Sequence, residues 1–196
     1  MYVFGASGHA KVIIESLLSR DIDVEGIFDD DLSIKSILGF KVLGRFDREL
    51  VLRSQMIIGI GNNSIREKIA ELYRAEFGNA IHFSSVVSPS AILGNGVAIM
   101  ARAVINADSK IGDHVIINTS ASVDHDCTIG DFSHVAPNST ICGGIKIGRR
   151  TLVGAGAVIG PNLTIGNDVV IGAGAVVTQN VGNNMVVVGH NKIIKQ

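Results

Sequence analysis

Residues 123–148 read VDHDCTIGDFSHVAPNSTICGGIKIG and belong to a longer periodic stretch that runs from Val87 to Val177. Every sixth residue of this stretch is Val, Ile or Leu, and glycine often follows it. The position four residues after the aliphatic one is mostly small or β-branched, as at Ala103 and Ser109. The aliphatic positions are Val87, Leu93, Ile99, Ile105, Ile111, Ile117, Val123, Ile129, Val135, Ile141, Ile147, Val153, Ile159, Ile165, Ile171 and Val177.

A six-residue period matches neither the 3.6-residue helix nor the alternation of a long strand. It is typical of a short strand followed by a tight turn, repeated many times. Three such units close a triangular coil of eighteen residues, and successive coils stack about 4.8 Å apart into a parallel β-helix. The aliphatic residues would then fill the prism and the small residues its corners. A β-sandwich with a fortuitous period is the alternative, and the regularity of the repeat disfavours it.

Length and composition limit the classes of protein to consider. At 196 residues, with 46% hydrophobic residues, the chain has room for one or two domains with a sizeable core. A net charge of −1 gives no sign of the excess of basic residues that is typical of nucleic-acid-binding proteins. Two cysteines do not suggest a disulfide framework, and Cys127 occupies a small inward position of the repeat. No signal peptide or membrane span is readable, so a cytoplasmic protein is expected.

The first residues predict a strand, a turn and a helix that together form a phosphate-facing motif. A short apolar strand at Tyr2–Phe4 is followed by Gly5–His9, which read GASGH, and then by a helical pattern that begins before Val12. Backbone N–H groups in such a turn, and the helix N-terminus after it, are suited to a phosphate. The glycine spacing differs from that of the dinucleotide fingerprint.

A second strand is expected at Val24–Phe28 and is followed by Asp29, Asp30 and Asp31. Acidic residues after the second strand of an α/β nucleotide site commonly meet a ribose or a base edge. The alternative is a solvated turn, and the sequence alone does not decide between the two.

A third strand is expected at Met56–Ile60, and the turn after it contains Gly61. Ser64 and Glu67 suggest a capping box for a helix that runs to about Phe77. Residues 1–80 therefore predict a small Rossmann-like α/β domain with an open parallel sheet and a site at the carboxyl ends of its strands. Residues 81–196 predict the β-helix, with a final strand at Met185–Val188 and a tail that caps its open end.

The polar side chains of the solenoid concentrate at Asn118 and in residues 124–134. His125 stands between Asp124 and Asp126, and a carboxylate beside an imidazole orients the ring and stabilises its protonated form, which suits a general base. A histidine in a solvated turn is the alternative. A zinc site built from His114, His125 and His134 is a further alternative. These histidines differ in phase and none is one coil from another, so no metal is expected.

The repeats resemble those of the left-handed β-helix acyltransferases. The segments Gly5–His9, Phe28–Asp30, Gly59–Asn63 and His125–Gly130 together resemble one branch of that group. This branch contains the nucleotide-aminosugar N-acetyltransferases of bacterial glycan synthesis, of bacillosamine and perosamine type, and the related sialic acid O-acetyltransferases. The resemblance covers essentially the whole chain.

The resemblance implies that acetyl-CoA donates its acetyl group to the 4-amino group of a UDP-linked 4-amino-4,6-dideoxysugar. It implies that His125 is the general base and that Asp126 raises its basicity. Residues implied to bind acetyl-CoA are His134, Ala155 and Ala173. Residues implied to form the nucleotide-sugar pocket are Ser7, Gly8, His9, Asp29, Asp30 and Gly61.

Two departures from the family pattern stand out. Asp126 replaces a residue that is often Glu, and the tail reads Gly189-His190-Asn191-Lys192 where Gly-x-Pro-Ala-Lys is usual. Several alternatives stay open: O-acetylation of sialic acid, N-acetylation of GDP-perosamine, a nucleotide-sugar-binding protein without activity, and a zinc hydratase of the same solenoid fold.

The spacing of two histidines predicts the oligomeric state. His125 and His134 are nine residues apart, half of one coil, so they should lie on roughly opposite sides of one prism. If both contact one acetyl group, as the resemblance implies, they come from different chains. A homotrimer with its active site between subunits is therefore expected.

Overall fold

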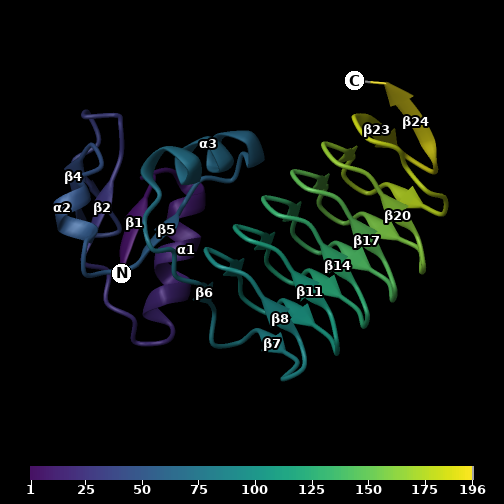
Figure 1. The fold of residues 1–196 in the computed structure, drawn as a ribbon, viewed down its shortest axis with the longest axis horizontal. Coiled ribbons are helices and arrows are strands. Elements are labelled where there is room, and N and C mark those ends of the chain that lie inside the picture. The colour runs from purple at the N-terminus through teal and green to yellow at the C-terminus, as the bar shows by residue number, and fades with distance from the viewer. Residues whose placement is uncertain (196) are drawn as a thin grey trace.

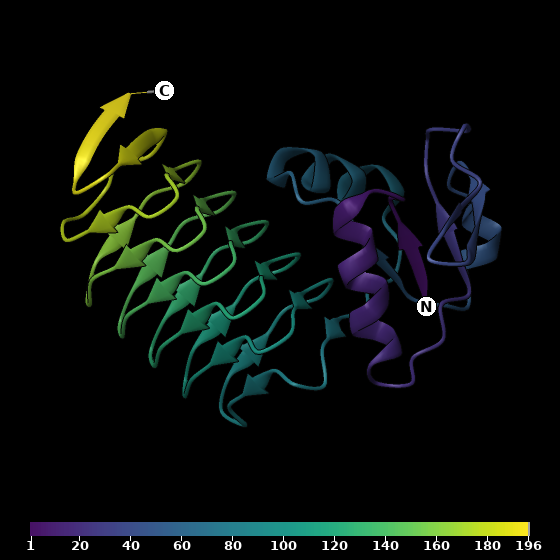
Figure 2. The ribbon, with the colours of Figure 1, turned by 180° about the vertical axis from the view of Figure 1, so that it is seen from behind.

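The computed structural model describes residues 1–195, which form a small α/β domain followed by a solenoid of triangular coils (Figures 1 and 2). The predicted combination of an open α/β sheet and a left-handed parallel β-helix is confirmed. In both views α1 and α3 lie on the side of the α/β domain that faces the solenoid.

The α/β domain is a five-stranded sheet in the order β3-β4-β2-β1-β5. Neighbouring strands are parallel except for the antiparallel pair β3 and β4. The strands are β1 (Tyr2–Phe4), β2 (Gly26–Phe28), β3 (Ser36–Ile37), β4 (Phe40–Gly44) and β5 (Met56–Ile58). The helices are α1 (Gly8–Leu18), α2 (Arg48–Val51) and α3 (Asn63–Tyr73). Since β2 and β5 flank β1, the order reverses there, and open α/β sheets bind ligands in the crevice at such a switch point.

Several predicted boundaries in this domain are wrong. The second predicted strand, which is β2, begins at Gly26 rather than Val24. The third predicted strand, which is β5, ends at Ile58 rather than Ile60. The third helix ends at Tyr73 rather than at Phe77, because Arg74 adopts a left-handed φ of 45° and closes the last turn.

The predicted capping box of Ser64 and Glu67 is also wrong. Asn62 is the N-cap of α3, and its side-chain oxygen accepts the N–H of Ile65 at 3.0 Å. Glu67 instead forms an ion pair at 2.8 Å with Arg150 of the solenoid, far away in the sequence.

The solenoid has three faces, and each is a sheet whose neighbouring strands are parallel and eighteen residues apart in the chain, except where β23 and β24 end face 1. Face 1 contains β6 (Ala80–Ile81), β9 (Ala98–Ile99), β12 (Ile116–Ile117), β15 (His134–Val135), β18 (Leu152–Val153), β21 (Val170–Ile171), β23 (Met185–Val188) and β24 (Lys192–Lys195). Face 2 contains β7 (Val86–Val87), β10 (Val104–Ile105), β13 (Ser122–Val123), β16 (Thr140–Ile141), β19 (Val158–Ile159) and β22 (Val176–Val177). Face 3 contains β8 (Ile92–Leu93), β11 (Lys110–Ile111), β14 (Thr128–Ile129), β17 (Lys146–Ile147) and β20 (Thr164–Ile165).

The prism is filled as the repeat predicts. Aliphatic side chains such as Ile105 and Val123 are completely buried, and so are corner residues such as Ala121. Cys127 belongs to the same core. The stack is therefore a continuous apolar core that no single coil could provide alone.

The two ends of the solenoid are closed differently. The ladder of face 1 begins at Ala80, which pairs with Ala98, next to the predicted domain division at residues 80 and 81. At the other end, β23 has the predicted bounds, and β24 pairs with it in antiparallel fashion. Among residues 1–195, no helix is long and apolar enough to cross a membrane.

Candidate functional site

His125 lies at the corner between faces 2 and 3, in the turn that joins β13 to β14. Its backbone N–H donates to Asp124 Oδ1 at 2.9 Å, and its Nδ1 lies 2.7 Å from Asp126 Oδ2. The hydrogen bond to Asp126, and then the charge of Asp124, raise the pKa of His125. Because the carboxylate accepts from Nδ1, the basic nitrogen is Nε2, on a side chain that is 60% exposed. This corner therefore exposes an imidazole nitrogen that is free to accept a proton.

His134 projects from β15 on face 1 and meets the α/β domain. Its Nδ1 lies 3.3 Å from the carbonyl oxygen of Gly61, and its Nε2 lies 3.0 Å from the amide nitrogen of Asn118. Its ring centroid is 5.9 Å from that of His9. Burial, and then the charge of Arg66, lower the pKa of His134 to about 4. His134 is thus a neutral imidazole at the contact between the two domains, and both of its ring nitrogens are already occupied by protein groups.

Four of the residues assigned to the nucleotide-sugar gather at the switch point of the sheet. Ser7 occupies the N-cap position of α1 without a side-chain cap hydrogen bond, and Gly8 begins the helix. His9 Nε2 is buried without a hydrogen-bond partner among the described residues, and burial lowers the pKa of His9 to about 4. Gly61 lies in the loop after β5, beside the ring of His9. The helix N-terminus and two glycine turns therefore converge where a phosphate would be favoured.

A small cavity of about 180 Å³ opens between the Gly61 loop and face 1 of the solenoid. It is lined by Gly61, Asn62, Asn63, Ser64, Leu152 and Val170. The loop after β5 and the outer surface of face 1 therefore line the same cavity.

The two carboxylates after β2 have different surroundings. Asp29 Oδ2 accepts the N–H of Ala6 at 2.6 Å, and its Oδ1 accepts the N–H of Asp31 at 2.8 Å. Asp29 therefore holds the turn after β1 in place, while the neighbouring Asp30 is exposed.

Ala155 and Ala173 are exposed and lie on consecutive coils, at the corner between faces 1 and 2. The carbonyl of Ala155 accepts the N–H of Gly174 at 2.8 Å. A Cβ atom added at Gly156 or Gly174 would meet nothing within 4 Å. This corner therefore exposes backbone that a long ligand could follow, and it is a different corner from that of His125.

Arg66 on α3 was not among the predicted site residues. In the structure it is almost completely buried, with 1% of its surface exposed. Its Nε donates to the carbonyl of His114 at 2.8 Å, and its Nη2 to that of Phe132 at 2.7 Å. Its Nη1 donates to the carbonyl of Ile60 at 3.0 Å, so one guanidinium ties the loop after β5 to two coils. Burial lowers the pKa of Arg66 to about 9.

A second set of charges supports this junction. The carboxylate of Glu67 accepts from Arg149 and Arg150, and Arg150 Nε also donates to Asp168 at 2.6 Å. Hydrogen bonds to Asp168 and Glu67 raise the pKa of Arg150. Arg66 and Glu67, which are neighbours on α3, thus contact three successive coils. No local sequence pattern predicts this arrangement.

The histidines weighed as metal ligands do not converge. His114 stacks on Phe132 with ring centroids 4.9 Å apart and meets Phe77 edge-on at 4.5 Å. Within residues 1–195, no group of three or more His, Cys, Asp or Glu side chains is placed to hold a metal ion. The thiol of Cys127 donates to the carbonyl of Cys142 at 3.2 Å, and burial raises its pKa, which is unfavourable for a nucleophile.

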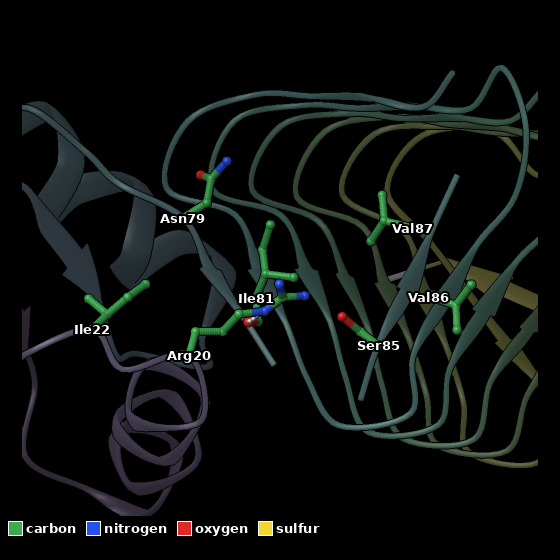
Figure 3. Close-up of a pocket in the computed structure, with 7 residues that line it drawn as sticks. All are labelled: Arg20, Ile22, Asn79, Ile81, Ser85, Val86 and Val87. Carbon is green, nitrogen blue, oxygen red and sulfur yellow. Dashed lines mark hydrogen bonds between the residues drawn. The ribbon is translucent and has the colours of Figure 1, made fainter. Parts of the chain in front are cut away.

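A larger cavity, of about 510 Å³, lies elsewhere, between the end of α1 and the first coil (Figure 3). Arg20 crosses this region and donates to the carbonyl of Ile81 at 3.3 Å. The lining residues are Arg20, Ile22, Asn79, Ile81, Ser85, Val86 and Val87. None of the predicted site residues is among them, so size alone does not identify the candidate site.

Comparisons with known proteins agree with this two-part architecture. Residues 1–73 match the model of the PglD N-terminal domain. Residues 108–143 and 144–179 match the model of the bacterial transferase hexapeptide (six repeats).

Two solved structures resemble nearly the whole chain. One is a variant of perosamine N-acetyltransferase from Caulobacter crescentus, with a histidine replaced by asparagine, in complex with CoA and GDP-perosamine. It is 43% identical, with a TM-score of 0.92, over 96% of this chain and 92% of that one. The other is the acetyltransferase domain of PglB from Neisseria gonorrhoeae in complex with acetyl coenzyme A. It is 35% identical, with a TM-score of 0.90, over 100% of this chain and 98% of that one.

Among curated proteins, the UDP-N-acetylbacillosamine N-acetyltransferase of Bacillus subtilis (strain 168) is 35% identical over 110 residues. This match covers 50% of this chain and 50% of that protein. The chain thus spans about half of the length of this curated relative, and 20% of another.

Proposed function

This chain belongs to the family of perosamine and bacillosamine N-acetyltransferases, and we propose that it moves the acetyl group of acetyl-CoA to the 4-amino group of a UDP-linked 4-amino-4,6-dideoxysugar. The observation that carries the proposal is the pair of His125 and Asp126, an exposed imidazole held by a carboxylate at 2.7 Å on a solenoid corner. GDP-perosamine is a second candidate acceptor, because identity is higher to the perosamine enzyme, at 43%, than to the PglB domain, at 35%.

The proposed reaction is direct transfer between the two substrates. His125 Nε2 accepts the proton of the sugar amine as its nitrogen attacks the thioester carbonyl, and Asp126 stabilises the imidazolium that forms. As the tetrahedral intermediate collapses, the C–S bond breaks and the imidazolium returns the proton to the departing thiolate. Neither cysteine takes part in this scheme.

The α/β domain is the proposed acceptor site. Ser7, Gly8, His9 and Gly61 surround the switch point of the sheet, where a diphosphate would meet the N-terminus of α1. Asp30 is exposed beside this region and is proposed to contact the nucleoside. His9 is neutral and its Nε2 has no hydrogen-bond partner among the described residues, so it is suited to hydrogen-bond a ligand without adding charge.

The proposed donor site follows Ala155 and Ala173, whose corner leaves room beside Gly156 and Gly174. Face 2 separates this corner from that of His125 within one chain. Since a side of about six residues spans up to roughly 20 Å, one chain does not bring the two corners together. We therefore propose a homotrimer in which His125 of one subunit meets the donor corner of its neighbour.

The composition of the faces supports this assembly. Outward residues of face 2 carry no charge, whereas face 3, marked by β8 to β20 in Figure 1, carries Lys110 and Lys146. The outward residues of face 2 are Val86, Val104, Ser122, Thr140, Val158 and Val176. An uncharged face of mostly β-branched residues is the one better suited to be covered by a second subunit.

The function is tested by offering UDP-, GDP- and CMP-linked sugars, including 4-amino-4,6-dideoxysugars, together with acetyl-CoA. Thiol release and product mass are measured, with His125→Ala as the control. An aminosugar product that resists hydroxylamine is an amide and supports the proposal. A hydroxylamine-labile ester on a sialic acid substrate would establish O-acetylation instead, and binding without thiol release would leave a sugar-binding protein.

The trimer is tested by mixing two inactive variants. His125→Ala removes the base, and Ala155→Glu places a charged side chain in the proposed donor corner. Mixed subunits should recover part of the wild-type activity, because some interfaces combine the intact halves, while each variant alone stays inactive. A fully active monomer in sedimentation at the assay concentration contradicts the proposal.

A further inference from the structure

Gly143 lies one coil above His125, in the same column of the solenoid. The N–H of Gly144 donates to the carbonyl of His125 at 2.9 Å, and the N–H of Asn162 donates to the carbonyl of Gly143 at the same distance. The imidazole of His125 leans over this glycine. A Cβ atom built at Gly143 would lie 2.7 Å from both Cε1 and Nε2 of the ring and 3.3 Å from Cδ2.

The backbone does not explain the glycine at this position. In the Gly143–Gly144 pair only Gly144 has a left-handed φ, of 70°, so residue 143 could carry a side chain without backbone strain. The positions in the same column of the other coils do carry one: Pro89, Ala107 and Pro161. Glycine occurs in this register only where the ring of His125 needs the space.

We propose that Gly143 is a positioning residue for His125: its missing side chain provides the space in which the imidazole lies with Nδ1 on Asp126. The ring has no other hydrogen bond from its nitrogens among the described residues, and the side chain is 60% exposed. The position of the ring is therefore defined by two features: the space that a side chain of residue 143 would fill, and the carboxylate of Asp126. This role in the reaction rests on the proposed function, whereas the position of the ring does not.

The test is Gly143→Ala, in which the added methyl group displaces the exposed end of the ring and separates Nδ1 from Asp126. The pKa of His125 is followed by NMR of its Cε1–H without substrates. In Gly143→Ala it should fall toward the pKa that His125 has in the Asp126→Asn variant. The kcat of acetyl transfer should fall about tenfold, less than the roughly 10²- to 10⁴-fold contribution of a general base because the base is displaced rather than removed, while both KM values stay within about twofold. Gly182→Ala is the matched control, because its added Cβ meets nothing within 4 Å.

A double variant separates positioning from a general loss of structure. If Gly143 acts through the bond to Asp126, adding Gly143→Ala to Asp126→Asn should cost little further activity. Any drop in melting temperature caused by Gly143→Ala should disappear in a His125→Ala background, because the nearest three atoms all belong to that ring. An unchanged His125 titration together with an unchanged kcat overturns the proposal. The titration decides it even if the chain transfers no acetyl group, so the two proposals can fail separately.

Discussion

The corner of His125 and the junction of His134 place the same side chain in opposite environments. At the corner, the hydrogen bond to Asp126 and then the charge of Asp124 raise the pKa of the imidazole, and the exposed side chain leaves Nε2 available. At the junction, burial and then the charge of Arg66 lower the pKa of His134 to about 4, and the ring nitrogens contact the Gly61 carbonyl and the Asn118 amide. An exposed histidine can therefore take up a proton during a reaction, whereas a buried one joins domains. The comparison predicts that one region controls turnover and the other stability.

The largest expected effect is that of removing the base. His125→Ala should lower kcat by roughly 10²- to 10⁴-fold, the usual range for a general base, without changing the melting temperature. His134→Ala should leave the acidic limb of the pH–rate profile where it is, because His134 is already neutral. If His125→Ala keeps nearly full activity, the corner is not catalytic.

Acidification should act on the junction through stability. The buried histidines His9, His114 and His134 have pKa values of about 4 when folded, against an ordinary 6.5. Between these values the unfolded chain binds more protons, so stability is full above pH 6.5 and is lost as the pH falls toward 4. Because three groups contribute, chemical denaturation at pH 7 and pH 5 should differ by roughly 5 kcal/mol. Equal midpoints would show that these side chains are not buried in solution.

Removing the guanidinium at the junction should also destabilise the fold. Arg66→Met leaves the buried carbonyls of His114 and Phe132 without a donor, which should cost roughly 2 kcal/mol of unfolding free energy. Urea denaturation measures this cost, with Arg53→Met at an exposed position of the same domain as the control. A loss of activity with unchanged stability would indicate instead that Arg66 contacts a substrate.

At the corner, Asp126→Asn should have an intermediate effect. Without the carboxylate, the pKa of His125 falls, so the acidic limb of kcat against pH should move to lower pH and the plateau should fall about tenfold. A pH–rate profile recorded for the wild type and the variant checks both changes. A limb that stays in place would mean that another group controls it.

The smallest effect is expected in the acceptor pocket. Asp30→Ala should raise the KM of the nucleotide-sugar several-fold, equivalent to about 1 kcal/mol, and leave the KM of acetyl-CoA unchanged. Asp29→Ala should in addition lower the melting temperature, because Asp29 holds the N–H of Ala6. Initial-rate kinetics with each substrate varied separates the two. An increase in the KM of acetyl-CoA would reverse the assignment of the pockets.

The sequence predicts the solenoid far better than the junction. Each coil repeats the same requirement at the same position, so Ile105, Val123 and Ile141 could be placed inside the prism from the period alone. The first residue of α3 could not be predicted in this way, because Asn62 and Ser64 are both good N-cap residues and the choice between them depends on tertiary contacts.

The candidate site divides in the same way. His125 and Asp126 are neighbours in the chain, so their contact was predictable. The burial of Arg66 was not, because its partners are backbone carbonyls on coils that lie far along the sequence. Gly143 could have been found by aligning the chain in steps of eighteen residues, which places a glycine directly above the histidine.

The contacts of α3 also bear on the order in which the protein is assembled during synthesis. Arg66 and Glu67 leave the ribosome early, but their partners extend from His114 to Arg150 and emerge several coils later. Until then the guanidinium stays in water and the loop that carries Gly61 has no solenoid beside it. The nascent α/β domain therefore holds an unfinished pocket, and a chain released before Arg150 is made lacks a partner of Glu67 and cannot complete it.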